Sequence, residues 1–160
     1  MRTAFFAVLF LAACDQPQAP PPAEQAAPAA SAFVGNVVIR LSALPDRPAA
    51  AYFTLRADEP GLTLLSVSSP SASRVELHET VTEGGMARMV PLDPATLELT
   101  APVAFAPGGK HAMLYDVRGL IPGQDAALLF TFRRASGGQI QVPATGTVQA
   151  AGAEMDHMAH

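Results

Sequence analysis

Hydrophobic and polar residues alternate in a series of short segments between residues 34 and 148. These segments cover residues 34–41, 50–55, 62–67, 74–81, 86–90, 97–99, 103–106, 111–117, 126–133 and 140–148. Glycine- and proline-rich turns separate them, for example Glu83-Gly84-Gly85 and Pro107-Gly108-Gly109. Short strands at regular spacing with such punctuation predict one all-β domain, built as a β-sandwich or a Greek-key barrel. We find no helical period and no internal repeat.

The N-terminal residues follow a different pattern. Arg2 precedes an apolar run over residues 4–13, which ends in Leu11-Ala12-Ala13-Cys14. The run is too short to cross a hydrocarbon core of ~30 Å as a helix, so it predicts a secretory signal. Its last four residues resemble the lipobox of bacterial lipoproteins, which implies cleavage before Cys14 and lipid on the sulfur and amine of that residue. An ordinary signal peptide with an incidental cysteine is the alternative.

Four regions follow from these patterns: a signal peptide (residues 1–13), a lipidated cysteine with a tether (14–32), a folded domain (33–148) and a flexible tail (149–160). The tether is rich in Pro and Ala and lacks the large apolar residues that a fold needs. Extended polyproline geometry gives it a reach of roughly 50 Å. We therefore expect the domain in the bacterial periplasm, anchored to a membrane. Asp15 slightly favours the inner membrane.

The amino-acid composition limits which partners and which metal ligands the protein can use. Of 160 residues, 49% are hydrophobic and 15% charged, with a formal net charge of -4. Such a chain has enough apolar residues for a core but no clustered basic face for nucleic acid. Cys14 is the only cysteine, which excludes a disulfide framework and a thiolate metal cluster. Any metal site must therefore use His, Met or carboxylate side chains.

Two histidines and two methionines are the candidate metal ligands. His111 and Met113 lie two residues apart on an expected strand, so their side chains leave the same face. His78 and Met89 lie on the two expected strands of a hairpin. Neutral thioether and imidazole groups suit soft Cu(I), whereas structural Zn(II) sites use Cys and His.

The hairpin turn decides how His78 and Met89 meet. A turn centred on Glu83-Gly84 pairs Thr82 with Gly85 and places His78 directly opposite Met89. A turn centred on Gly84-Gly85 keeps them on one face but diagonal. Met86 has the other parity in both registers, so we expect it to pack or to rim the loop. Glu76 and Glu79 are expected to be solvated. Arg88 and Lys110 either steer partners or lie on a solvated face.

The spacing His-x10-Met-x21-His-x-Met resembles that of the periplasmic copper chaperone family PCu(A)C. The flanking sequences, which are VELHE at 75–79, MARM at 86–89 and PGGKHAML at 107–114, are also similar to that family. The resemblance covers about residues 34–148. It implies a cupredoxin-like β-sandwich that holds Cu(I) with His78, Met89, His111 and Met113. It also implies a non-catalytic role, delivering copper to cytochrome oxidase copper centres, to another copper chaperone or to a related acceptor.

Other functions are weaker. A blue-copper electron-transfer centre needs a Cys ligand, and the sequence has neither a Gly-x-Ser-x-Gly elbow nor a His-Glu-x-x-His motif. A structural or copper-sequestering envelope lipoprotein that serves copper tolerance is the alternative to a chaperone. The tail contains a second candidate metal site, which could take Cu(II). Its residues are Met155, His157, Met158 and His160. The alternative is that the tail is a solvated end that binds no metal.

Overall fold

The computed structural model of the protein describes residues 32–153 and contains nine strands and one short 3-10 helix in that range. The elements are β1 (Ala32–Arg40), β2 (Ala49–Ala57), β3 (Thr63–Ser68), β4 (Arg74–Glu83), β5 (Met86–Pro91), η1 (Pro94–Thr96), β6 (Val103–Phe105), β7 (Lys110–Tyr115), β8 (Asp125–Arg133) and β9 (Gln139–Gln149). The predicted all-β class is confirmed. Within this range no helix is long and apolar enough to cross a membrane.

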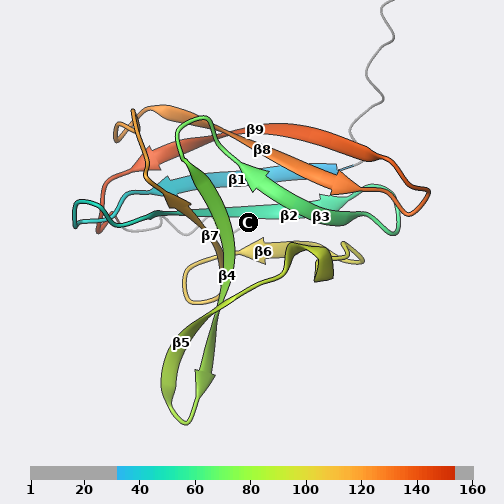
Figure 1. The fold of residues 1–160 in the computed structure, drawn as a ribbon, viewed down its shortest axis with the longest axis horizontal. Coiled ribbons are helices and arrows are strands. Elements are labelled where there is room, and N and C mark those ends of the chain that lie inside the picture. The colour runs from blue at the N-terminus through green and yellow to red at the C-terminus, as the bar shows by residue number, and fades with distance from the viewer. Residues whose placement is uncertain (1–31, 154–160) are drawn as a thin grey trace, which may run out of the picture.

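All nine strands belong to one sheet with the order β3-β8-β9-β1-β2-β7-β4-β5, and β6 pairs with β2 beside β7. Neighbours run antiparallel except β1 and β9, which are parallel. Strand β3, at one end of the path, also contacts β4 near the other end, so the sheet curls around a core. Figure 1 shows the β4–β5 hairpin projecting from the body of the domain.

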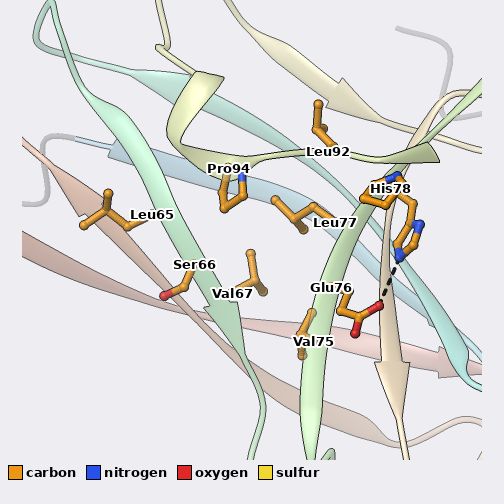
Figure 2. A pocket seen from close by; sticks show the side chains of 10 residues that line it. Leu65, Ser66, Val67, Val75, Glu76, Leu77, His78, Leu92 and Pro94 are labelled. Carbon is orange, nitrogen blue, oxygen red and sulfur yellow. Dashed lines mark hydrogen bonds and ion pairs between the residues drawn. The ribbon is translucent and has the colours of Figure 1, made fainter.

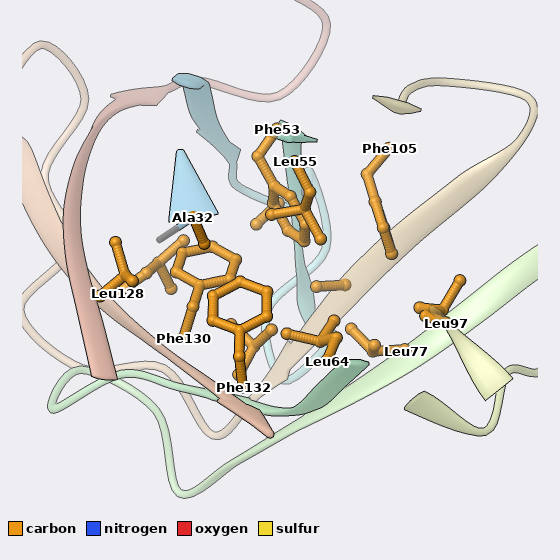
Figure 3. Packing of buried hydrophobic residues seen from close by; sticks show 14 of the residues in the cluster. Ala32, Phe53, Leu55, Leu64, Leu77, Leu97, Phe105, Leu128, Phe130 and Phe132 are labelled. Atoms are coloured by element: carbon orange, nitrogen blue, oxygen red, sulfur yellow. The ribbon is translucent and has the colours of Figure 1, made fainter. Parts of the chain in front are cut away.

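Strict alternation along the strands builds this core. In β2, Ala49, Ala51, Phe53 and Leu55 are buried, and the residues between them are partly exposed. In β8 the same period buries Phe130 among others. The ring of Phe53 stacks on Phe105 with centroids 4.4 Å apart, and meets Phe130 edge-on at 4.9 Å. The core therefore lies between β2, β6 and β8 (Figure 3).

One expected strand is absent. Residues 97–99 form only a single bridge, between Thr63 and Glu98, and the segment before them is the helical turn η1. The side chain of Asp93 caps that turn by accepting from the Ala95 amide at 2.9 Å, and Pro94 occupies its first position. An Asp cap followed by Pro favours a helical start over a strand. Leu97 and Leu99 still reach the core.

Candidate metal site

Strand β7 carries two of the candidate ligands on its outer face. Ala112 and Leu114 are fully buried in the core. Because side chains alternate along a strand, His111 and Met113 leave the opposite face. The strand is pinned between β2 and β4, and Met113 lies between Ala50 on one side and Glu76 on the other. The sheet therefore fixes the direction in which both candidate ligands point.

Strand β4 places His78 beside this pair. His78 is the register partner of His111, and their ring centroids lie 6.1 Å apart with an interplanar angle of 19°. Leu77, its neighbour, faces the core and is buried. Two imidazoles therefore stand side by side on adjacent strands.

The β4–β5 hairpin turns at Gly84-Gly85, the register that leaves His78 and Met89 diagonal to each other. Glu83 pairs with Met86, so Gly84-Gly85 form the turn, and Met89 faces Thr80 instead of His78. Both glycines have positive φ angles, 59° and 79°. A two-residue turn with positive φ at both central positions suits two glycines and disfavours Glu83 there. The Glu83-Gly84 turn with direct His78–Met89 pairing is therefore wrong, and the two residues are diagonal neighbours.

Met89 nevertheless reaches a candidate ligand. Its Sδ lies 3.2 Å from Nε2 of His111. The other ring nitrogen of His111, Nδ1, lies 3.0 Å from the carbonyl oxygen of Gly109, which can only accept a hydrogen bond. In a neutral imidazole, Nδ1 therefore carries the proton and Nε2 presents a lone pair towards the sulfur. Two lone-pair donors thus converge on one point.

The carbonyl of Gly109 organises this arrangement. It also accepts from the backbone amide of Thr80 at 3.1 Å, and Thr80 is the register partner of Met89. One oxygen therefore fixes the ring of His111 and holds β4 against the loop before β7. Sequence reasoning identified Pro107-Gly108-Gly109 only as a turn. Nothing in the residue type indicated this role, because the acceptor belongs to the backbone.

The four candidates divide between two hollows. Met89, His111 and Met113 line one of about 330 Å³. His78 lines a neighbouring one of about 490 Å³, together with Glu76 and apolar side chains (Figure 2). Nδ1 of His78 is buried and has no hydrogen-bond partner. The structure thus gathers three candidates in one hollow and keeps the fourth next to it.

Glu76 forms a hydrogen bond with His78. Its Oε2 lies 3.2 Å from Nε2 of His78, and its Oε1 accepts from the Arg74 guanidinium at 2.9 Å. The hydrogen bond from Arg74, followed by those from Tyr115 and His78, lowers the pKa of Glu76 to about 2. The carboxylate is therefore ionised and accepts a hydrogen bond from Nε2–H, which leaves the lone pair of His78 on Nδ1. Glu76, expected to be a solvated strand residue, has a side chain that is 43% exposed, and it also pairs with Arg74 and His78.

Other charged residues near the site are also paired. Lys110 contacts Glu79 at 2.7 Å, and Arg88 contacts Glu83 at 2.8 Å. Glu79, also expected to be solvated, is 34% exposed at its side chain and holds Lys110. The donors that remain for a metal are neutral imidazole and thioether groups, a set that fits a soft monovalent ion.

Several predicted site residues lie outside the part of the chain that the structure describes. They are the candidate lipidation residue Cys14 and the second candidate copper site, made of Met155, His157, Met158 and His160. Between residues 32 and 153, no group of three or more His, Cys, Asp or Glu side chains is arranged to hold a metal.

Comparison with known sequences identifies a family. The model of a family described as LpqE-like lipoproteins matches residues 33–144. The uncharacterized protein RP573 of Rickettsia prowazekii (strain Madrid E) is 34% identical over 86 residues, which are 52% of this chain and 48% of that protein. The chain thus spans about half the length of this curated relative.

Comparison with solved structures supports the fold. The copper-bound PCuAC domain from PmoF2 is 22% identical, with a TM-score of 0.51 over 75% of this chain and 93% of that one. Apo-DR1885 from Deinococcus radiodurans is 26% identical, with a TM-score of 0.51 over 91% and 97% of the two chains. Its Cu(I) form is 26% identical, with a TM-score of 0.50 over 79% and 81%. The resemblance to PCu(A)C domains is confirmed in the fold.

Proposed function

The chain belongs to the LpqE-like lipoprotein family, and from that premise we propose that it is a non-catalytic Cu(I) chaperone of the bacterial cell envelope. The domains that share its fold include a copper-bound PCuAC domain and the Cu(I) form of DR1885. Cu(I) is the cargo of this protein, and its ligands are His78, Met89, His111 and Met113.

One observation carries the proposal: the 3.2 Å approach of the His111 Nε2 lone pair to the Met89 sulfur. Two lone pairs that have no proton between them repel each other. A soft cation that lies against both atoms accepts both lone pairs and holds them together. Met113 lines the same hollow, and the unpartnered Nδ1 of His78 lies on the adjacent strand. Because thioethers are neutral, the site binds copper without releasing a proton from them, and only the imidazoles must be unprotonated.

Exposure of one ligand suits hand-over. The side chain of Met89 is 54% exposed, whereas His111 is only 7% exposed. An acceptor can therefore displace Met89 first, while the buried imidazole still holds the ion. A protein that only sequesters copper has no need of an exposed ligand, so this contrast favours a chaperone over storage for copper tolerance. Cytochrome oxidase copper centres, or another copper chaperone, are the acceptors we propose.

A competition titration tests the site. The copper-free protein, His111→Ala and Met89→Leu compete with a chromogenic Cu(I) chelator under reducing conditions. We expect one tight equivalent in the wild type and at least a tenfold weaker Kd in each variant, since losing even a residue that supports a metal ligand costs about 10- to 100-fold. Wild-type affinity in both variants, with circular dichroism unchanged, would exclude this site.

Envelope anchoring is a separate part of the proposal. Cys14 is the residue that would carry lipid, and residues 14–32 would act as the tether. Metabolic labelling with a fatty acid should mark the wild type and not Cys14→Ser, and the variant should move from the membrane fraction to the periplasmic fraction. Labelling of both forms would place the lipid elsewhere.

The tail is proposed as a second and weaker copper site that takes Cu(II), with Met155, His157, Met158 and His160 as its residues. Isothermal titration of the full chain and of a chain ending at Gly152 compares their stoichiometries. We expect one additional equivalent of Cu(II) in the full chain. Equal stoichiometry in both chains contradicts a tail site.

A further inference from the structure

A row of side chains crosses the sheet beside the proposed copper site. In register order it runs from Arg40 on β1 through Ala50 on β2 and Met113 on β7 to Glu76 on β4. Ala50 has the smallest side chain of the row, and the hollow of about 330 Å³ opens over it. Arg40 lines this hollow together with His111, Met113 and Met89. The site therefore has an open space on one side with a guanidinium at its border.

Arg40 lacks a charged partner among residues 32–153. No Asp or Glu of that range forms an ion pair with it. Its Nε and Nη2 are buried without a hydrogen-bond partner, and its Cζ lies over the ring of Tyr52, 5.9 Å from the centroid. By contrast, Arg74 and Arg88, which also lie near the site, each hold a Glu. Buried charge without a partner is costly, so Arg40 is suited to receive an anion.

The proposed ligands leave a need for negative charge. Imidazole and thioether groups are neutral, and the carboxylate of Glu76 is already paired with Arg74. A bound Cu(I) therefore keeps its positive charge on the side that faces Arg40. An anionic group that enters the hollow would meet both charges at once. Among the anionic groups of proteins, a thiolate is the one that soft Cu(I) prefers, and a nearby cation lowers the pKa of a thiol.

We propose that the hollow over Ala50 is the entry site for a cysteine thiolate of the copper acceptor, and that Arg40 holds this thiolate before copper is transferred. The inference rests on the proposed function. The thiol loses its proton to water on entry, and its sulfur then donates an electron pair to Cu(I) as the bond to the Met89 thioether breaks. Copper stays Cu(I) throughout, and no electron is transferred.

The first test measures transfer from the Cu(I)-loaded full chain to two short peptides, one with two cysteines and one with two methionines in the same positions. Stopped-flow ultraviolet absorption follows the cysteine peptide, and copper analysis after rapid filtration follows the other. Arg40→Gln should slow transfer to the cysteine peptide by about tenfold relative to transfer to the methionine peptide. It should not weaken Cu(I) binding, because it removes a positive charge from beside the ion. Arg40→Lys should keep most of the rate.

Arg88→Gln is the matched control, because Arg88 also lies beside a ligand but is exposed and paired with Glu83. We expect it to transfer copper to both peptides at the wild-type rate. Equal slowing of both peptides in Arg40→Gln, or no slowing of either, overturns the proposal and leaves copper binding intact. Equal slowing by Arg40→Gln and Arg88→Gln indicates general electrostatic steering and also overturns it.

The copper-free protein provides a second readout. Thiocyanate, a small soft anion, is titrated into isotope-labelled protein, and the guanidinium resonances are followed by NMR. Those of Arg40 should shift with saturation, and those of Arg88 should not. A lack of saturable shift at Arg40 contradicts the anion site whether or not copper binds. If the shift occurs but Cu(I) does not bind at Met89 and His111, the proposed function fails while the anion site stands.

Discussion

Met89 Sδ and His111 Nε2 lie 3.2 Å apart although their strands, β5 and β7, are not neighbours. Strand β4 runs between them, so the two backbones are roughly 10 Å apart at the usual strand spacing. Thr80 of β4 is the register partner of Met89. Thr80 and Met89 line the same hollow, and the length of a methionine lets its sulfur reach the ring of His111. A ligand on the projecting hairpin thereby reaches a ligand on the central part of the sheet.

The first prediction separates the two methionines of the hairpin. Met89→Leu should weaken Cu(I) binding by at least tenfold, since even losses next to a metal ligand cost about 10- to 100-fold. Met86→Leu should leave the affinity unchanged, because Met86 is 75% exposed and belongs to the opposite face of β5. Leucine is close in size to methionine, so both variants should keep wild-type stability. Competition titration gives the two affinities, and an equal loss in both would contradict the assignment of Met89.

Sequence reasoning located most of the fold for a simple physical reason. Strands such as β2 and β8 bury one face and expose the other, and this leaves a period of two in the sequence. Residues 97–99 were misassigned because their apolar character reflects core packing. The Asp93 cap and Pro94 had already started a helical turn. A capping residue followed by proline was a readable signal that the apolar pattern obscured.

The site was only partly predictable. Parity on β7 placed His111 and Met113 on one face, and the structure agrees. The hairpin register follows from the chemistry of the turn, because a Gly84-Gly85 turn places glycine at both positions of positive φ, where other residues are strained. The pairing of Glu76 with Arg74 and His78 depends on which carboxylate oxygen faces which donor. A pattern of residue types does not contain that information.

The second prediction concerns the pH dependence of stability. The folded protein holds the pKa of Glu76 at about 2, below its ordinary value of 4.5. Ionised Glu76 therefore stabilises the fold above pH 4.5, and this contribution is lost as the pH falls from 4.5 towards 2. Glu76→Gln should be less stable than the wild type at pH 6, and the difference should shrink at pH 3. Urea denaturation at both pH values measures it.

Arg74→Gln is the control for that measurement, because the hydrogen bond from Arg74 is the largest cause of the lowered pKa. In the Arg74→Gln background, the further change Glu76→Gln should produce a smaller difference between pH 6 and pH 3. A pH-dependent difference of the same size with and without Arg74 would mean that another group holds the carboxylate.

The third prediction concerns His111 as an anchored ring. Its Nδ1–H donates to the Gly109 carbonyl, which also accepts from Thr80, so loss of the ring does not leave that oxygen without a partner. His111→Ala should therefore destabilise the copper-free fold by only about 2 kcal/mol, from the net value of one hydrogen bond and the lost burial of a ring that is 7% exposed. Its Cu(I) affinity should fall by a much larger factor. Unfolding and titration of the same sample compare the two effects, and a loss of several kcal/mol in stability would assign His111 a mainly structural role.

The fourth prediction tests the core that supports the site. The ring of Phe53 is 1% exposed and contacts the rings of Phe105 and Phe130 (Figure 3). Phe53→Ala removes these contacts and leaves a cavity, so it should lower the free energy of unfolding by about 3–5 kcal/mol. Phe33→Ala is the matched control, because that ring is 49% exposed and should change stability by less than about 1 kcal/mol. Urea unfolding of the copper-free chain gives both values. A small loss for Phe53→Ala would mean that the strands around it close the gap, and that the core does not hold β2 rigidly beside the candidate ligands.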